Sequence, residues 1–217
     1  MFKWNGTVWS PLSSATSPSI PADISTNQNL NAVHVIDTNG DGLGNIGFAV
    51  GNSGIILQYN GTNWVAATSP VATNMMGVFV VSASEAWAVG ASGDILKWNG
   101  STWTLNNSTS TQTLNAVSMI DTDGDGLANY GVAVGNAGQI MTYNGTTWAS
   151  TTSGANNLMA VSVLDVNDAW AAGASGRFTH WDGSIWTTST FGALQVNGLS
   201  FVAPDVDKTT GWTQVFH

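Results

Sequence analysis

Two segments of the sequence carry oxygen-bearing side chains at alternate positions, a pattern that could hold a metal ion. They are residues 37–45, with the sequence DTNGDGLGN, and residues 121–129, with the sequence DTDGDGLAN. A hard cation such as calcium needs several oxygen ligands, and glycine permits the sharp turn that a short loop requires. The alternative is an ordinary turn, because Asp, Asn and Gly favour turns without any metal. Two copies in register favour calcium over the plain turn.

Both segments resemble the calcium loops of the integrin α-chain propeller (FG-GAP-like) family, in which Asp-x-Asp/Asn-x-Asp-Gly-x-x-Asp joins two strands of a sheet. The resemblance implies two structural calcium ions, held by side chains at positions one, three, five and nine and by the backbone carbonyl at position seven. The implied ligands are Asp37, Asn39, Asp41, Leu43 and Asn45 in the first loop, and Asp121, Asp123, Asp125, Leu127 and Asn129 in the second. Position nine departs from the family, because it is Asn in both loops. With three carboxylates against two, the second loop is expected to bind calcium more tightly.

A repeated phrase predicts the elements that must position these loops. An aromatic residue, Asn or Asp, Gly, Thr or Ser, any residue and Trp occur in this order five times, starting at Trp4, Tyr59, Trp98, Tyr143 and Trp181. Short apolar runs separated by Gly-rich or Asn-Gly turns predict four antiparallel strands per repeat, and each Asn-Gly pair predicts a type I′ hairpin turn. A period of roughly 40 to 50 residues in a strand-rich chain is typical of a β-propeller.

We therefore predict a single domain over residues 1–217, an all-β, five-bladed β-propeller with four antiparallel strands in each blade. Four blades are complete, at residues 30–64, 75–103, 114–148 and 158–186. The fifth is composite, because residues 196–217 match the first two strands of a blade and residues 1–9 match the last two. Such a blade closes the ring by pairing edge strands that would otherwise be exposed. A fragment of a larger ring is the alternative.

The composition excludes several classes of function. Four Lys and Arg stand against thirteen Asp and Glu, giving a net charge of −9, so the chain lacks the basic surface that nucleic acid requires. Cysteine is absent, which excludes disulfides and thiolate metal sites. No apolar run approaches the roughly 18 residues needed to cross a bilayer, so direct membrane insertion is not expected. The uncharged polar composition favours a secreted or cell-surface protein, and we expect the chain to belong to a larger protein or assembly.

The sequence gives no sign of an active site. The repeated phrase also resembles the Asp-box hairpin of sialidase-type propellers, but sialidases bind their substrate with a cluster of arginines and this chain has only Arg177. The three histidines are scattered along the chain. Glu85 and Asp168 are the two carboxylates that could serve a glycosidase mechanism. They fall at equivalent positions of different blades, however, and would lie far apart. We expect no enzymatic activity, and a glycan-active hydrolase ranks last among the possible functions.

The expected function is a calcium-stabilised binding or interaction module that makes protein–protein or structural contacts. The alternative is a multivalent, lectin-like propeller that binds carbohydrate, because five-bladed lectins of the tachylectin type have the same number of blades. A further phrase, Ala-Val-Gly-x-x-Gly, resembles the repeats of photosystem assembly factors. The Trp residues at the ends of the repeats are expected to pack between blades, whereas an exposed aromatic residue in each groove would favour the lectin.

Overall fold

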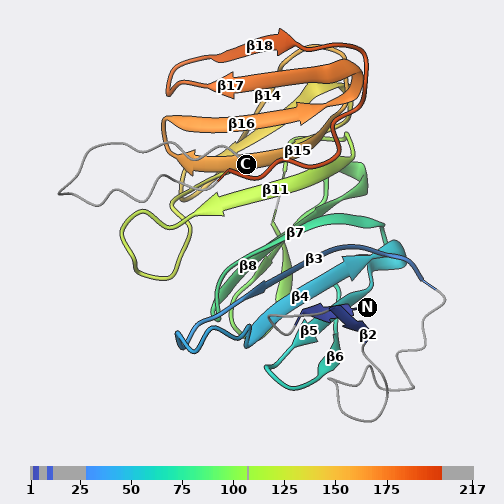
Figure 1. The fold of residues 1–217 in the computed structure, drawn as a ribbon, viewed down its shortest axis with the longest axis vertical. Coiled ribbons are helices and arrows are strands. Elements are labelled where there is room, and N and C mark those ends of the chain that lie inside the picture. Colours follow the sequence, from blue (N-terminus) through green and yellow to red (C-terminus); the bar gives the residue numbers. More distant parts are fainter. Residues whose placement is uncertain (1, 5–8, 12–27, 107, 202–217) are drawn as a thin grey trace.

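A computed structural model describes residues 2–4, 9–11, 28–106 and 108–201 of the chain. Four sheets of four antiparallel strands follow one another in chain order (Figure 1). We name them blades A to D. Blade A contains β3 (Leu30–Ile36), β4 (Ile46–Gly51), β5 (Ile56–Tyr59) and β6 (Trp64–Ala67). Blade B contains β7 (Met75–Ser82), β8 (Glu85–Gly90), β9 (Ile95–Trp98) and β10 (Trp103–Asn106).

Blades C and D repeat this arrangement. Blade C contains β11 (Leu114–Ile120), β12 (Tyr130–Gly135), β13 (Gln139–Tyr143) and β14 (Trp148–Thr152). Blade D contains β15 (Leu158–Asp165), β16 (Asp168–Gly173), β17 (Arg177–Trp181) and β18 (Trp186–Thr190). The first strands of successive blades contact each other, β3 with β7, β7 with β11 and β11 with β15. The four predicted complete blades are therefore confirmed, with their strands in the expected order.

Two kinds of turn connect the outer strands. Between the second and third strands, each blade has a single 3-10 turn, and these are η2 (Asn52–Gly54), η3 (Ala91–Gly93), η4 (Asn136–Gly138) and η5 (Ala174–Gly176). Between the third and fourth strands, the Asn-Gly pairs do not form the predicted type I′ turn, because only the glycine has a positive φ, 91° at Gly145. Instead, the side-chain oxygen of Asn144 accepts hydrogen bonds from the backbone amides of Thr146 and Thr147. The Asn side chain thus closes a longer turn.

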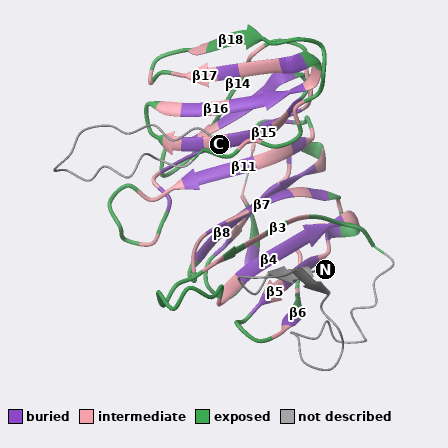
Figure 2. Ribbon diagram, viewed as in Figure 1, coloured by how far each residue is buried: buried purple, intermediate pink, exposed green. Residues whose placement is uncertain are grey.

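Aromatic side chains fill the interfaces between blades. Phe48 of blade A lies 5.1 Å from Trp98 and 4.9 Å from Trp103 of blade B, measured between ring centroids. Trp87 of blade B packs in the same way against Tyr143 and Trp148 of blade C. Figure 2 shows the buried residues along the strands of each blade and the exposed residues in the loops. We predicted that the repeated Trp residues pack between blades. In agreement, five of them are almost completely buried, namely Trp64, Trp87, Trp98, Trp103 and Trp148.

The fifth blade is described only in part. Strand β1 (Phe2–Trp4) pairs with β2 (Trp9–Pro11) as an antiparallel hairpin, as expected for the last two strands of a blade. Residues 196–201, where its first strand was predicted to begin, are not in a strand, and residues 202–217 lie outside the described part of the chain. The described residues therefore contain four complete blades and one hairpin, where the sequence had predicted five closed blades. The extent of the single domain stays a prediction.

Candidate functional site

The antiparallel topology sorts the connections of the blades onto two opposite faces. The loops between first and second strands and the turns between third and fourth strands share one face, which we call the loop face. It comprises residues 37–45, 60–63, 82–85, 99–102, 121–129, 144–147, 165–168 and 182–185. The four 3-10 turns η2 to η5 lie on the other face, which we call the turn face. Both acidic loops project from the left side of the molecule in Figure 1.

The loop face carries almost all the exposed negative charge of the described residues. Its aspartates are Asp37, Asp41, Asp121, Asp123, Asp125, Asp165, Asp168 and Asp182, and all of them are exposed or half-buried. Within the described part of the chain, the turn face has one acidic residue, Asp94 in blade B, and one basic residue, Arg177 in blade D. The ammonium group of Lys97 forms an ion pair with Glu85 at 2.8 Å, so it does not neutralise the aspartates of the loop face.

Large apolar side chains stand among these aspartates. Leu43 and Ile185 are each 61% exposed, Leu127 is 45% exposed and Val166 is 38% exposed. Leu43 and Leu127 lie at the tips of the two acidic loops, and Val166 and Ile185 belong to the two loop-face connections of blade D. The loop face therefore combines negative charge with exposed apolar side chains.

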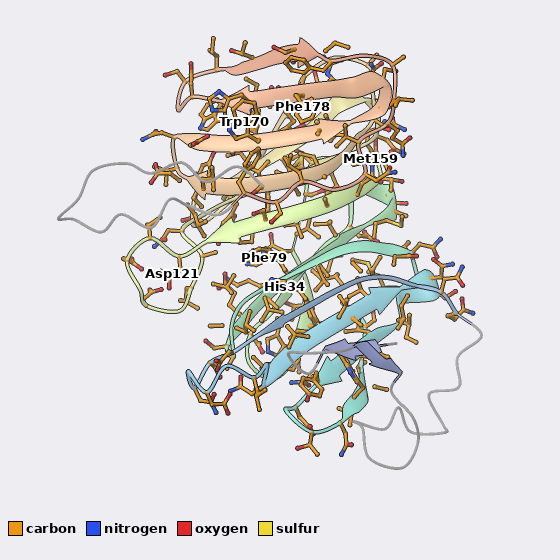
Figure 3. The ribbon with its side chains drawn as sticks, viewed as in Figure 1. His34, Phe79, Asp121, Met159, Trp170 and Phe178 are labelled. Carbon is orange, nitrogen blue, oxygen red and sulfur yellow. The ribbon has the colours of Figure 1, made fainter. Side chains whose placement is uncertain are left out.

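The loop at Asp121 gathers three of its predicted calcium ligands. Carboxylate oxygens of Asp121, Asp123 and Asp125 lie within 4.8 Å of one another. Figure 3 shows Asp121 where the loop leaves blade C. The Asp121 carboxylate also accepts hydrogen bonds from the backbone amides of Asp123, Gly124 and Gly126. Three converging carboxylates fit a hard cation, and the loop also holds its shape through its own amides.

Position nine of both loops has a different environment. The side-chain oxygen of Asn129 accepts hydrogen bonds from the backbone amide and hydroxyl group of Thr122, and Asn45 accepts the same two bonds from Thr38. In the first loop, the Asn39 amide group donates to the carboxylate of Asp41. The asparagines at position nine therefore close the base of each loop through their threonine partners.

Backbone amides lower the pKa of the first carboxylate of each loop. Hydrogen bonding, first from the amide of Gly42, lowers the pKa of Asp37, and the amide of Gly126 does the same for Asp121. Both hydrogen bonds favour the ionised form of the carboxyl group. Asp182, in the last turn of blade D, has its pKa lowered in the same way, first by the amide of Ile185. These three groups stay negatively charged on the loop face.

Glu85 is the residue of this region that the sequence did not assign correctly. It was considered only as a weak glycosidase candidate, but the structure buries it completely between blades B and C. One carboxylate oxygen accepts hydrogen bonds from the Trp87 indole at 2.7 Å and from the backbone amide of Ala128 at 3.0 Å. The other oxygen lies 2.8 Å from Nζ of Lys97. The sequence offered one signal, since Glu85 is the sole glutamate of the chain.

The histidines of the described part have structural partners. The Nδ1 atom of His34 accepts a hydrogen bond from the backbone amide of Val80, and the imidazole stacks on Phe79 (Figure 3). Burial lowers the pKa of His34, which favours the neutral ring that this hydrogen bond requires. His180 lies 3.0 Å from the carboxylate of Asp168 and stacks on Trp170.

One small hollow was found on the turn-face side of blade B. It has a volume of about 100 Å³ and is lined by Ser92, Gly93, Asp94, Leu105, Asn106, Ser108 and Ser110. It contains no aromatic ring on which a sugar could stack. In blades A to C the tryptophans at the ends of the repeats pack between blades instead, so an exposed aromatic residue in each groove, which would have favoured a lectin, is not observed among the described residues of these blades. Among the described residues, no helix is long and apolar enough to span a membrane.

Comparison with known proteins identifies the fold only. No protein-family model matches the chain, and no curated protein is significantly similar to it. The solved structure of U3-55K and the WD40 repeats of RRP9 each match with a TM-score of 0.58 and 10% identity, over 72% of this chain and 47% of theirs. YCF48 bound to a D1 peptide matches with a TM-score of 0.52 and 19% identity, over 84% of this chain and 57% of that one. The chain spans about half the length of these structures.

The chain is a β-propeller repeat protein. The prediction of a calcium-stabilised module, with a lectin as its alternative, is wrong, because the structures that share the fold include U3-55K, the WD40 repeats of RRP9 and YCF48. Aromatic packing between blades holds the fold, and the acidic loops are shaped by their own backbone amides. The predicted secreted or cell-surface location is also wrong, because it rested on the amino-acid composition and these fold neighbours do not support it. Ser, Thr, Asn and Gly are residues that turns and strand edges require in any compartment, so this composition does not identify one.

Proposed function

We propose that the chain is a non-enzymatic protein-interaction scaffold that docks its partner on the loop face. The observation that carries the proposal is the asymmetry of negative charge between the two faces. Eight aspartates and four exposed apolar side chains lie on the loop face, whereas Asp94 is the acidic residue that the described part of the turn face provides. Charge complementarity speeds association and selects the partner, and exposed apolar side chains supply contact area.

The partner that fits this surface is a protein segment with Lys or Arg residues next to apolar ones. The lysines would approach the aspartates of the acidic loops, and apolar side chains would contact Leu43, Leu127, Val166 and Ile185. One fold neighbour, YCF48, has been solved with a D1 peptide bound, which shows that a protein of this fold takes a peptide partner. For the present chain, a peptide partner is the proposal.

The test measures binding of two synthetic peptides that differ only in the sign of their charge. One alternates Lys with Leu and the other alternates Glu with Leu, and fluorescence anisotropy is measured with a chelator present. We expect binding of the Lys peptide alone, and binding about threefold to tenfold weaker for Asp123→Asn combined with Leu127→Ala. Asp94→Asn, the same chemical change on the turn face, is the matched control. Equal binding of both peptides, or equal losses in the two variants, contradicts the proposal.

We further propose that the two acidic loops bind calcium, with the loop at Asp121 the tighter. The three converging carboxylates of that loop support this proposal. The ligands would be Asp121, Asp123 and Asp125 with the carbonyl of Leu127, and Asp37, Asn39 and Asp41 with the carbonyl of Leu43 in the other loop. The oxygens of Asn45 and Asn129 would complete the sites as predicted if they exchanged their Thr partners for the ion. Bound calcium would reduce the negative charge available to a cationic partner.

We also propose that a composite fifth blade closes the ring. Between neighbouring blades, the backbone amide of Val80 donates to His34, and that of Val163 donates to Oγ of Ser118 at 3.1 Å. The amide of Phe201 makes the equivalent bond to Oγ of Ser162 at 3.4 Å. The segment after blade D therefore lies beside β15 as the first strand of a fifth blade would, which supports closure with the β1–β2 hairpin.

A further inference from the structure

Blade B contacts the acidic loop of blade C at two points. The buried carboxylate of Glu85 accepts a hydrogen bond from the backbone amide of Ala128, 3.0 Å away. The hydroxyl group of Ser82 donates to the carbonyl oxygen of Gly126, 2.6 Å away. Gly126 and Ala128 flank Leu127, the apolar tip of the loop. Two neighbouring backbone groups of the loop are thus bound from a different blade, about 43 residues earlier in the chain.

From these contacts we infer that Glu85 is a positioning residue, which together with Ser82 holds the loop at residues 121–129 in its docking conformation. The inference rests on the proposed docking role of the loop face. A hydrogen bond to an ionised carboxylate is stronger than one to a neutral group, and Glu85 lies where water does not reach it. The tether therefore orders the part of the loop that carries Leu127, while the aspartates on the other side of the tip remain exposed.

The surroundings of Glu85 hold its carboxylate in place. Its first oxygen also accepts a hydrogen bond from the Trp87 indole, and its second oxygen pairs with Nζ of Lys97. The ammonium group of Lys97 lies 4.9 Å from the centre of the Trp87 ring. Since a buried carboxylate needs partners for both of its oxygens, these two side chains fix the direction in which Glu85 meets the amide of Ala128.

The other acidic loop has no such tether among the described residues. Every hydrogen bond of residues 37–45 that the structure gives is made within the loop or to Ile36 at its base, as in the bond from the Asn45 amide to the Ile36 carbonyl. The two loops have nearly the same sequence, yet among the described residues only the loop at residues 121–129 is fastened to the preceding blade. We therefore expect the loop at residues 121–129 to be the better ordered, and the loop at residues 37–45 serves as an internal reference.

The experiment compares two double variants that both lack the buried ion pair. Glu85→Gln with Lys97→Met keeps an oxygen that can accept the Ala128 amide, whereas Glu85→Met with Lys97→Met removes it. Hydrogen exchange is followed separately for residues 121–129 and 37–45 in the full chain. We expect the Gln variant to match the wild type, and the Met variant to exchange roughly tenfold faster at residues 121–129 alone. The inference is wrong if both variants exchange alike, or if residues 37–45 change as much.

A third variant, Ser82→Ala, keeps the inference testable if the Met variant does not fold. It removes the hydrogen bond to Gly126 without changing a residue of the buried core. It also leaves the indole of Trp87 bonded to Glu85, which the Met variant does not. We expect faster exchange at Gly126 and its neighbours, and unchanged exchange in β8. No effect at residues 121–129 would overturn the inference even if the Met variant fails to fold. Hydrogen exchange needs no partner, so a failure of the docking proposal in the peptide assay stays separate from a failure of the tether.

Discussion

The indole ring of Trp170 stacks on the imidazole of His180 in blade D, with ring centroids 4.1 Å apart and planes at 19°. The equivalent tryptophan of blade B, Trp87, is fully buried beneath Tyr143 and Trp148 of the next blade. Trp170 is only half-buried within the described part of the chain, where Phe201 is its aromatic neighbour on that side, at 5.9 Å. Figure 3 shows Trp170 and Phe178 on blade D. This side of blade D is where a fifth blade would pack.

Replacing Trp170 with Ala in the full chain tests the closure of the ring. If the composite blade covers Trp170, the free energy of unfolding should fall by about 3–5 kcal/mol, as expected for a buried tryptophan. Trp87→Ala is the control, because the structure already shows its burial. Urea denaturation of the two variants gives the comparison. A loss below about 1 kcal/mol for Trp170→Ala, alongside a loss of several for Trp87→Ala, would mean that nothing covers blade D.

Calcium titration by calorimetry should detect two binding events of unequal affinity. Asp125→Asn removes one of three converging carboxylates and should weaken the tighter event to about the affinity of the other, and Asp41→Asn, which leaves one carboxylate, should weaken the weaker event further. Each variant serves as the control for the other, because the same chemical change is made at the same position of the two loops. Absence of heat in the wild-type chain would mean that both loops are plain turns.

The acidic loops should make the stability of the chain depend on pH in the acid range. Because folding lowers the pKa of Asp37 and of Asp121, their contribution is fully present above the unfolded pKa of about 3.9. It is lost as the pH falls through the lowered folded values. Melting temperatures measured between pH 6 and pH 2 in chelator should therefore fall less steeply in the double variant Asp37→Asn, Asp121→Asn. Parallel curves for the variant and the wild type would contradict this assignment.

The 3-10 turn of blade C should respond in opposite directions to two neighbouring substitutions. Ala137 is exposed and has a φ of 54°, a left-handed conformation that costs a non-glycine residue about 1 kcal/mol. Ala137→Gly should therefore raise the free energy of unfolding by up to about 1 kcal/mol. Gly138 also has a positive φ, and a Cβ atom there would collide with the carbonyl oxygen of Gly154, so Gly138→Ala should destabilise the chain by more than about 1 kcal/mol. Urea denaturation measures both, and equal effects would contradict the conformations described.

The sequence was sufficient for the four blades because their signals are local. The strands between Leu30 and Trp186 follow from short apolar runs and from turn residues that act on their immediate neighbours. The positions of the Asn-Gly turns were predicted correctly, but their turn type was not. The choice between a type I′ turn and a longer turn closed by Asn144 depends on the length of the hairpin loop. The function inferred from the calcium-loop resemblance was wrong, since a loop pattern does not identify the protein that carries it.

The period, the strands, the acidic loops and the excess of negative charge could all be predicted from the amino-acid sequence, because they depend on residues close together in the chain. The folded structure was needed to show that the aspartates gather with four apolar side chains on one face. It also decided that Glu85 is a buried partner of Ala128 and that Trp170 is open where Trp87 is covered. Each of these depends on contacts between blades, which join residues about 40 positions apart. No local pattern records such contacts, because the partner side chain is supplied by another repeat.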